Sequence, residues 1–238
     1  MDVEGKNNVP SVIAAAHELK SPLSLIRQLS LILEDESLTA DQRSVSVNRI
    51  YLTTQKALRL TSDLTRAYNL NDPTLFPLSP ISPLQVCNDL LYDMKPYIEA
   101  KGKSVAFYSP TKIPLVISNA DLLGRILSNF LDNAINYTFD NEKMQLNLKV
   151  YKKENKVRFG LRDFGPAIKA SYFEDIKNGM TKNAEVVHAR PASSGLGIYI
   201  SSQFAEIINS KIGVIRHRNG ATFYVDVPIS SQLKLFEI

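Results

Sequence analysis

The sequence predicts an α+β protein in two parts, an antiparallel helical hairpin that dimerises into a four-helix bundle and then an α/β sandwich. Three observations predict this: two long helical apolar patterns near the N-terminus, a proline-rich stretch over residues 71–80, and alternating helix and strand signals beyond it. The chain has 238 residues, enough for two modest domains. We expect a hairpin over residues 1–72, a linker over 73–80 and a second domain over 81–238.

The first helix is expected from Pro10 to about Asp35, because apolar residues recur there with alternating spacings of four and three. Pro22 lies inside this pattern, so the helix should bend or loosen beside His17. The predicted seam consists of Val12, Ala16, Leu19, Leu23, Ile26, Ser30 and Leu33.

A second helix is expected after the capping box of residues 39–42, Thr-Ala-Asp-Gln. Its predicted seam consists of Val47, Ile50, Thr54, Ala57, Thr61, Leu64 and Tyr68. The short connection predicts an antiparallel hairpin. Two helices alone leave a wide apolar face exposed, so we expect a homodimer through the hairpin.

The second part reads as a mixed sheet with helices on one face. Asn219-Gly220 is a turn pair that predicts a final hairpin. Helices are expected at residues 83–101, 119–137 and 195–208, a helical turn at 173–177, and strands at 104–109, 115–118, 144–151, 156–162, 211–216 and 221–228.

Composition excludes several classes of protein. The net charge is +4, and no lysine or arginine cluster is interleaved with aromatics, so we expect no nucleic-acid partner. The single cysteine, Cys87, excludes an intramolecular disulfide and fits a reducing compartment. No run of about 18 apolar residues exists, so we expect no membrane segment in this chain and a cytoplasmic location.

Residues 17–23 read HELKSPL and combine features that a purely structural helix rarely needs. His17 lies one position beyond the seam, so it should flank the bundle and reach solvent. Its neutral imidazole is a nucleophile whose proton Glu18 could accept or orient. The competing interpretation is a surface histidine on a proline-kinked helix.

Three asparagines, Asn129, Asn133 and Asn136, share one face of the helix expected at 119–137. Asparagine is a poor helix-interior residue, and its amide oxygen suits a Mg²⁺ ion that already carries phosphate oxygens. A solvated polar face is the alternative.

Two glycine-containing turns follow. Asp163-Phe164-Gly165 comes after a predicted strand, where a carboxylate can accept a hydrogen bond from the amine of adenine and glycine permits close approach. Residues 193–198, SSGLGI, open a helix, and successive N–H groups at such a start form an anion site.

In this order, the four motifs resemble the boxes of sensor histidine kinases. HELKSPL is similar to the phosphoacceptor box, NFLDNAINYT (129–138) to the N box, DFGPAI (163–168) to the first glycine box and SSGLGI to the second. The resemblance covers about residues 10–229. It implies a dimerisation and phosphotransfer hairpin followed by a catalytic ATP-binding domain, autophosphorylation with Mg-ATP, and phosphoryl transfer to an aspartate of a response-regulator receiver domain.

The resemblance also implies a role for individual residues. His17 would accept the phosphoryl group, Glu18 would act as base or orienter, and Ser21 would help position water when the hairpin dephosphorylates the regulator. Asn133 would hold Mg²⁺. The implied nucleotide-binding residues are Asn129, Asn133, Tyr137, Asp163, Gly165, Ile168, Ser194, Gly195, Leu196 and Gly197.

Four departures from the family pattern stand at Ala167, Asn136, Asn178 and Ser193. If position 167 needs a positive φ, alanine costs about 1–2 kcal/mol. Residues 169–194 should form the lid over the nucleotide, although 173–176 resemble the F box only loosely; Lys182 or Arg190 could reach the γ-phosphate. His188 and His217 read as surface residues.

Two alternatives stay open. The first is a weakened kinase that acts mainly as a response-regulator phosphatase or an ATP-binding scaffold. The second is a non-kinase member of the same ATPase superfamily, which would have no reason for HELKSPL. Sensor kinases usually carry an input domain or membrane segment upstream, so we expect either a truncated chain or a separate sensory partner.

Overall fold

The computed structural model describes residues 12–68, 73–138, 145–168, 173 and 196–231. The chain divides into two compact units, Met1–Asn69 and Leu70–Ile238. None of the described helices is both long and apolar enough to cross a membrane.

The first unit is the predicted helical hairpin, with α1 at Val12–Leu33 and α2 at Ala40–Tyr68. The capping box is present, because Thr39 N–H donates to Gln42 Oε1 at 3.0 Å and Gln42 N–H donates to Thr39 Oγ1 at 3.2 Å. Arg43 closes the loop by donating to the carbonyls of Leu33 and Asp35. As expected, α1 runs as one helix with Pro22 inside it.

The hairpin buries only a narrow stripe of its apolar residues. Leu29 and Ala57 are buried, whereas Leu23 and Val47, both in the predicted seams, are more than half exposed. The large exposed apolar side chains of the hairpin are Leu23, Leu31, Ile32, Val45, Val47, Tyr51 and Leu58. The predicted seams therefore combine residues that face the other helix with residues that a single hairpin leaves uncovered.

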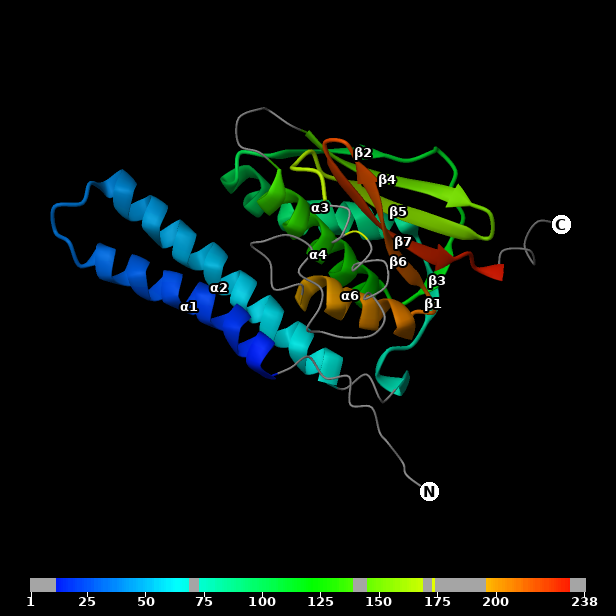
Figure 1. Ribbon diagram of the computed structural model, residues 1–238, viewed down its shortest axis with the longest axis horizontal. Helices are drawn as coiled ribbons and strands as arrows, with labels where there is room; N and C mark the ends of the chain where they lie inside the picture. Colours follow the sequence, from blue (N-terminus) through cyan, green and yellow to red (C-terminus); the bar gives the residue numbers. More distant parts are fainter. Residues whose placement is uncertain (1–11, 69–72, 139–144, 169–172, 174–195, 232–238) are drawn as a thin grey trace, which may run out of the picture. The chain divides into compact units, whose positions relative to one another are not determined.

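The second unit consists of mixed sheets and helices (Figure 1). Its five-stranded sheet has the order β2-β4-β5-β7-β6, with β2 parallel to β4 and the other neighbours antiparallel. A separate antiparallel pair joins β1 to β3. The elements are η1 (Pro73–Leu75), β1 (Ser79–Ile81), α3 (Pro83–Ala100), β2 (Ser104–Tyr108), β3 (Val116–Ser118), α4 (Ala120–Tyr137), β4 (Gln145–Lys153), β5 (Lys156–Arg162), α6 (Leu196–Ile207), β6 (Lys211–His217) and β7 (Gly220–Pro228).

Helices α3, α4 and α6 lie on one face of this sheet, as Figure 1 shows. The strands turn alternate apolar side chains toward them; Phe159 of β5 and Val225 of β7 are fully buried. Phe130 of α4 packs against Phe223 of β7 with ring centroids 5.8 Å apart. The predicted fold class is confirmed.

Two details differ from the sequence analysis. We did not predict β1, which pairs Ser79–Ile81 with Val116–Ser118 inside the stretch that we had assigned partly to a linker. The last hairpin turns at Arg218 and Asn219, one residue earlier than expected, and Gly220 is already paired with His217. Of the helical turn expected at 173–177, only Phe173 lies within the described residues.

Candidate functional site

Helix α4 carries the asparagine motif and starts as the sequence predicts. Asn119 caps it, because its Oδ1 accepts the N–H of Leu122 at 3.0 Å. The same side chain donates to the carbonyl of Pro77 at 3.1 Å and so fixes the entry of the chain. The apolar residues of α4 face the core, and Asn129 and Asn133 are half-buried, one turn apart, on another face of the helix.

Asn129 joins α4 to the first turns of α6. Its Nδ2 donates to the carbonyl of Gly197 at 3.3 Å and to Ser201 Oγ at 3.2 Å. Gly197 and Leu196, both predicted nucleotide-binding residues, are therefore next to the asparagine face of α4. Leu196 is buried against the core.

Asn133 lies one turn after Asn129, and its side chain forms no hydrogen bond to another described residue. Its amide oxygen is thus available to a hard cation. Within the described ranges no three histidine, cysteine or acidic side chains gather as a metal site. The amide oxygen of Asn133 has the chemistry to hold a Mg²⁺ ion that already carries phosphate oxygens.

Asn136 differs from its two companions. It is exposed, its Nδ2 donates to the carbonyl of Asp132 at 2.8 Å, and the Tyr97 hydroxyl approaches its Oδ1 at 3.4 Å. The same hydroxyl donates to Asp132 Oδ1 at 2.7 Å. Asn136 thus takes part in the contact between α3 and α4.

The C-terminal end of α4 meets the Asp163 turn. Thr138 is buried, and its Oγ1 donates to the carbonyl of Ala134 at 2.8 Å and accepts the N–H of Phe164 at 3.5 Å. Lys103 Nζ donates to the Thr138 carbonyl at 3.1 Å. Tyr137, the predicted adenine-pocket residue, is half-buried immediately before Thr138.

Asp163 follows β5 directly and is 2 % exposed. Its N–H donates to the Ala221 carbonyl at 2.9 Å, and its Oδ1 accepts the N–H of Gly165 at 3.1 Å. Ile168, at the end of the same turn, is buried. Two backbone hydrogen bonds therefore hold Asp163: its own N–H is bonded to Ala221, and its carboxylate is bonded to the N–H of Gly165.

Ala167 carries no left-handed strain. Among the described non-glycine residues with positive φ are Glu154 and Asn209, and Ala167 is not one of them. The cost that we attached to a positive φ at this position therefore does not apply here.

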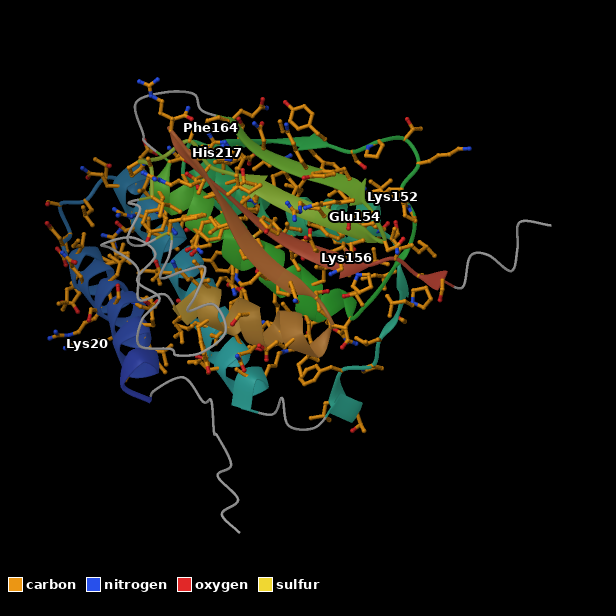
Figure 2. The ribbon with its side chains drawn as sticks, turned by 45° about the vertical axis from the view of Figure 1, so that its right-hand side comes forward. Lys20, Lys152, Glu154, Lys156, Phe164 and His217 are labelled. Atoms are coloured by element: carbon orange, nitrogen blue, oxygen red, sulfur yellow. The ribbon has the colours of Figure 1, made fainter. Side chains whose placement is uncertain are left out.

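The surroundings of Asp163 contain two further titratable groups, Arg162 and His217. Burial lowers the pKa of Arg162, and the Asp163 carboxylate opposes this effect. Burial and the Arg162 guanidinium lower the pKa of His217. The Nε2 atom of His217 is 2.8 Å from Thr222 Oγ1. Phe164 and His217 lie at the same end of the sheet (Figure 2).

In the hairpin, the backbone of His17 belongs to α1, and its side chain lies outside the described set. Glu18 is half-buried and Ser21 is exposed. The remaining predicted positions outside the described residues are Ser194 and Gly195, the departures Asn178 and Ser193, the residues Lys182, His188 and Arg190, and nearly all of the expected lid.

The sequence analysis missed Thr138, Arg162 and Asn219 as supports of the site. It read Asn219 and Gly220 only as a turn. Thr138 and Arg162 contact the Asp163 turn, Asn219 contacts Arg162, and Gly220 lies against Asp163. No local sequence signal points to these residues, because their contacts join positions that are far apart in the chain.

Comparison with known proteins shows what this chain resembles. Residues 118–231 match the family described as histidine kinase-, DNA gyrase B-, and HSP90-like ATPase. The histidine protein kinase SaeS of Staphylococcus epidermidis is 26 % identical over 200 residues, which cover 84 % of this chain and 57 % of that kinase. SaeS of Staphylococcus aureus shows the same identity and coverage. By sequence and fold, the chain is similar to sensor histidine kinases, and it spans little more than half the length of these relatives.

Solved structures share the fold. Full-length ShkA in complex with AMPPNP has a TM-score of 0.61 at 23 % identity, covering 93 % of this chain and 46 % of that one. The Acinetobacter baumannii histidine kinase AdeS has a TM-score of 0.62 at 15 % identity, covering 90 % of this chain and 98 % of that one. ThkA in complex with the response regulator TrrA has a TM-score of 0.58 at 17 % identity, covering 91 % and 60 %.

Proposed function

We propose that this chain is the catalytic core of a histidine kinase, which transfers the γ-phosphoryl group of ATP to His17 and then to an aspartate of a response-regulator receiver domain. One observation carries the proposal. A phosphoacceptor-like box in α1 precedes an ATPase-family domain in which α4 contacts the Asp163 turn at its C-terminal end and the start of α6 through Asn129, midway along the helix.

The ATP site would be built along α4. Asp163 would accept the exocyclic amine of adenine, with Tyr137, Gly165 and Ile168 lining the base pocket. Asn129, which is already bonded to Gly197, would support the phosphates near the start of α6, where the unpaired N–H groups of a helix favour anions. Ser194, Gly195 and Leu196 complete the proposed phosphate contacts.

Asn133 would hold Mg²⁺ through its amide oxygen. A bound Mg²⁺ ion would neutralise charge on the β- and γ-phosphates. The protein's own contribution is positioning, which is worth several kcal/mol when reacting atoms are held about 3–3.5 Å apart and aligned.

In the transfer, an imidazole nitrogen of His17 forms a bond to the γ-phosphorus while the bond from this phosphorus to the β,γ-bridging oxygen breaks. ADP leaves with that electron pair. Glu18, adjacent in sequence, would accept or orient the imidazole proton. In the second step the P–N bond breaks and a carboxylate oxygen of the regulator forms the new P–O bond.

The partners follow from the hairpin. We propose that two copies pair through the apolar residues that one hairpin leaves exposed, as isologous helical bundles do. The receiver domain would dock along the same hairpin. Ser21 is exposed one turn after His17, so it is available to position water if the hairpin also dephosphorylates the regulator.

The test is incubation with Mg²⁺ and ATP labelled at the γ-phosphate, followed by acid and base treatment of the protein. Acid-labile, base-stable label that maps to the peptide containing His17 supports the proposal. His17→Gln should abolish labelling and keep nucleotide affinity. Label retained in His17→Gln refutes the assignment of the acceptor, and ATP binding without label in the unmodified chain favours the phosphatase or scaffold alternative.

Asn133→Ala provides the second arm. It removes the proposed Mg²⁺ ligand from a position with no other hydrogen-bond role among the described residues, so the fold should persist. Labelling should fall strongly, and the loss should be partly recovered at high Mg²⁺. An unchanged rate would remove Asn133 from the site.

A further inference from the structure

The side chain of Arg162 fastens the Asp163 turn to the turn between β6 and β7. Its Nη1 donates to the carbonyl of Asp163 and lies 3.4 Å from that of Ala221. Its Nη2 donates to Asn219 twice, to the carbonyl at 3.1 Å and to Oδ1 at 2.8 Å. One guanidinium thus joins the end of β5 and the Asp163 turn to a turn more than 50 residues later.

The same guanidinium lies over the Phe164 ring, 4.6 Å from its centroid. Arg162 thus contacts both Asp163 and Phe164. Phe164 in turn links this turn to the end of α4, because its N–H donates to Thr138. Lysine could not reproduce these contacts, since it presents a single ammonium in place of a planar fork.

Gly220 lets the two turns approach each other. Its φ of +110° lies in the region that favours glycine. A Cβ at this position would overlap the carbonyl oxygen and Oδ1 of Asp163, and would lie 2.8 Å from Arg162 Nη1. Any side chain at position 220 must therefore displace the Asp163 carboxylate or its backbone.

We propose that Arg162 and Gly220 are positioning residues that set the base specificity of the nucleotide site by fixing the Asp163 carboxylate. The inference rests on the proposed function, in which Asp163 reads the exocyclic amine of adenine. A buried acceptor discriminates strongly against a base that lacks its donor, because the hydrogen bond that adenine would donate is then lost. Discrimination of this kind requires a fixed acceptor.

The experiment compares ATP with purine riboside triphosphate, which has hydrogen in place of the exocyclic amine. Dissociation constants are measured by calorimetry on the full chain and on Gly220→Ala. We expect the unmodified chain to prefer ATP by about tenfold or more, since a hydrogen bond to a charged group contributes about 1.5–3 kcal/mol. In Gly220→Ala the ratio of the two dissociation constants should be close to one, mainly because ATP binds more weakly.

Gly102→Ala is the matched control. Gly102 also has a positive φ, +62°, but a Cβ there meets nothing within 4 Å. It therefore introduces the same kind of backbone strain without touching Asp163, and its preference for ATP should equal that of the unmodified chain. Arg162→Lys is the second variant. It keeps the charge and loses the fork, so the preference should fall several-fold even if Gly220→Ala does not fold.

The outcomes separate the two levels of the proposal. If the unmodified chain prefers ATP and Arg162→Lys or a folded Gly220→Ala keeps the full preference, the positioning role is wrong while the ATP site stands. If the unmodified chain binds both nucleotides equally, Asp163 does not read adenine, and both ideas fail together. A preference lost in Gly102→Ala as well would assign the effect to strain rather than to contact with Asp163.

Discussion

A glutamate at position 58 should dissociate the proposed dimer. Leu58 of α2 is 60 % exposed in the single hairpin, and Tyr51 and Val47 on the same helix are 58 % and 52 % exposed. At about 100° per residue, the three side chains fall within about 40° of one another around the helix. They form one apolar stripe that lacks a partner within the described hairpin.

The magnitude follows from the exposed fraction. Full burial of a leucine side chain contributes about 1.5–3 kcal/mol, so the exposed part of Leu58 accounts for about 1–2 kcal/mol in each copy. A twofold dimer contains the position twice, and each introduced carboxylate must also be desolvated. Leu58→Glu should therefore weaken dimerisation by roughly 3–4 kcal/mol or more, a 10²- to 10³-fold rise in the dissociation constant.

Sedimentation equilibrium over a range of protein concentrations measures this constant directly. Tyr92→Glu is the control, because Tyr92 lies on α3 of the second unit and is 81 % exposed. It should leave dimerisation unchanged. If Leu58→Glu dimerises as tightly as the unmodified chain, the exposed stripe of α2 is not the dimer surface, and the reasoning from exposure fails.

Three further predictions concern the second unit. Asp226→Ala leaves the Arg158 guanidinium without the two 2.6 Å bonds that it makes now, so the free energy of unfolding in urea should fall by about 2–3 kcal/mol; a loss below 0.5 kcal/mol would contradict this. Burial raises the pKa of the Cys87 thiol to about 12, so a thiol reagent at about pH 8 should label it only after unfolding. The lowered pKa of His217 means that the unfolded chain binds more protons between the folded-state value and 6.5. Stability should therefore decrease as the pH falls through this interval, and His217→Asn should remove that part of the decrease below pH 6.5.

The features that the sequence predicted well are those that short-range chemistry determines. Thr39 and Gln42 satisfy each other's backbone within three residues, and Asn119 caps α4 through the N–H of Leu122. The alternation of β5 required no distant information either, and its bounds, Lys156–Arg162, are those that the sequence predicted.

The missed features depend on contacts between distant residues. Strand β1 has three residues, one of them Pro80, and exists because β3 supplies its partner. The role of Arg162 depends on Asn219, 57 residues later. In the hairpin, the predicted α1 seam included Leu23, which a single hairpin leaves exposed, and omitted Leu29, which is buried.

These contacts change how departures from the family pattern should be weighed. Ala167 replaces a glycine inside the motif, yet its backbone needs no glycine. Gly220 lies outside the quoted motifs, yet a side chain there would overlap Asp163. The proposed nucleotide site would therefore depend on a turn outside the four motifs, and alanine in place of a motif glycine at position 167 is a weak reason to expect an inactive kinase.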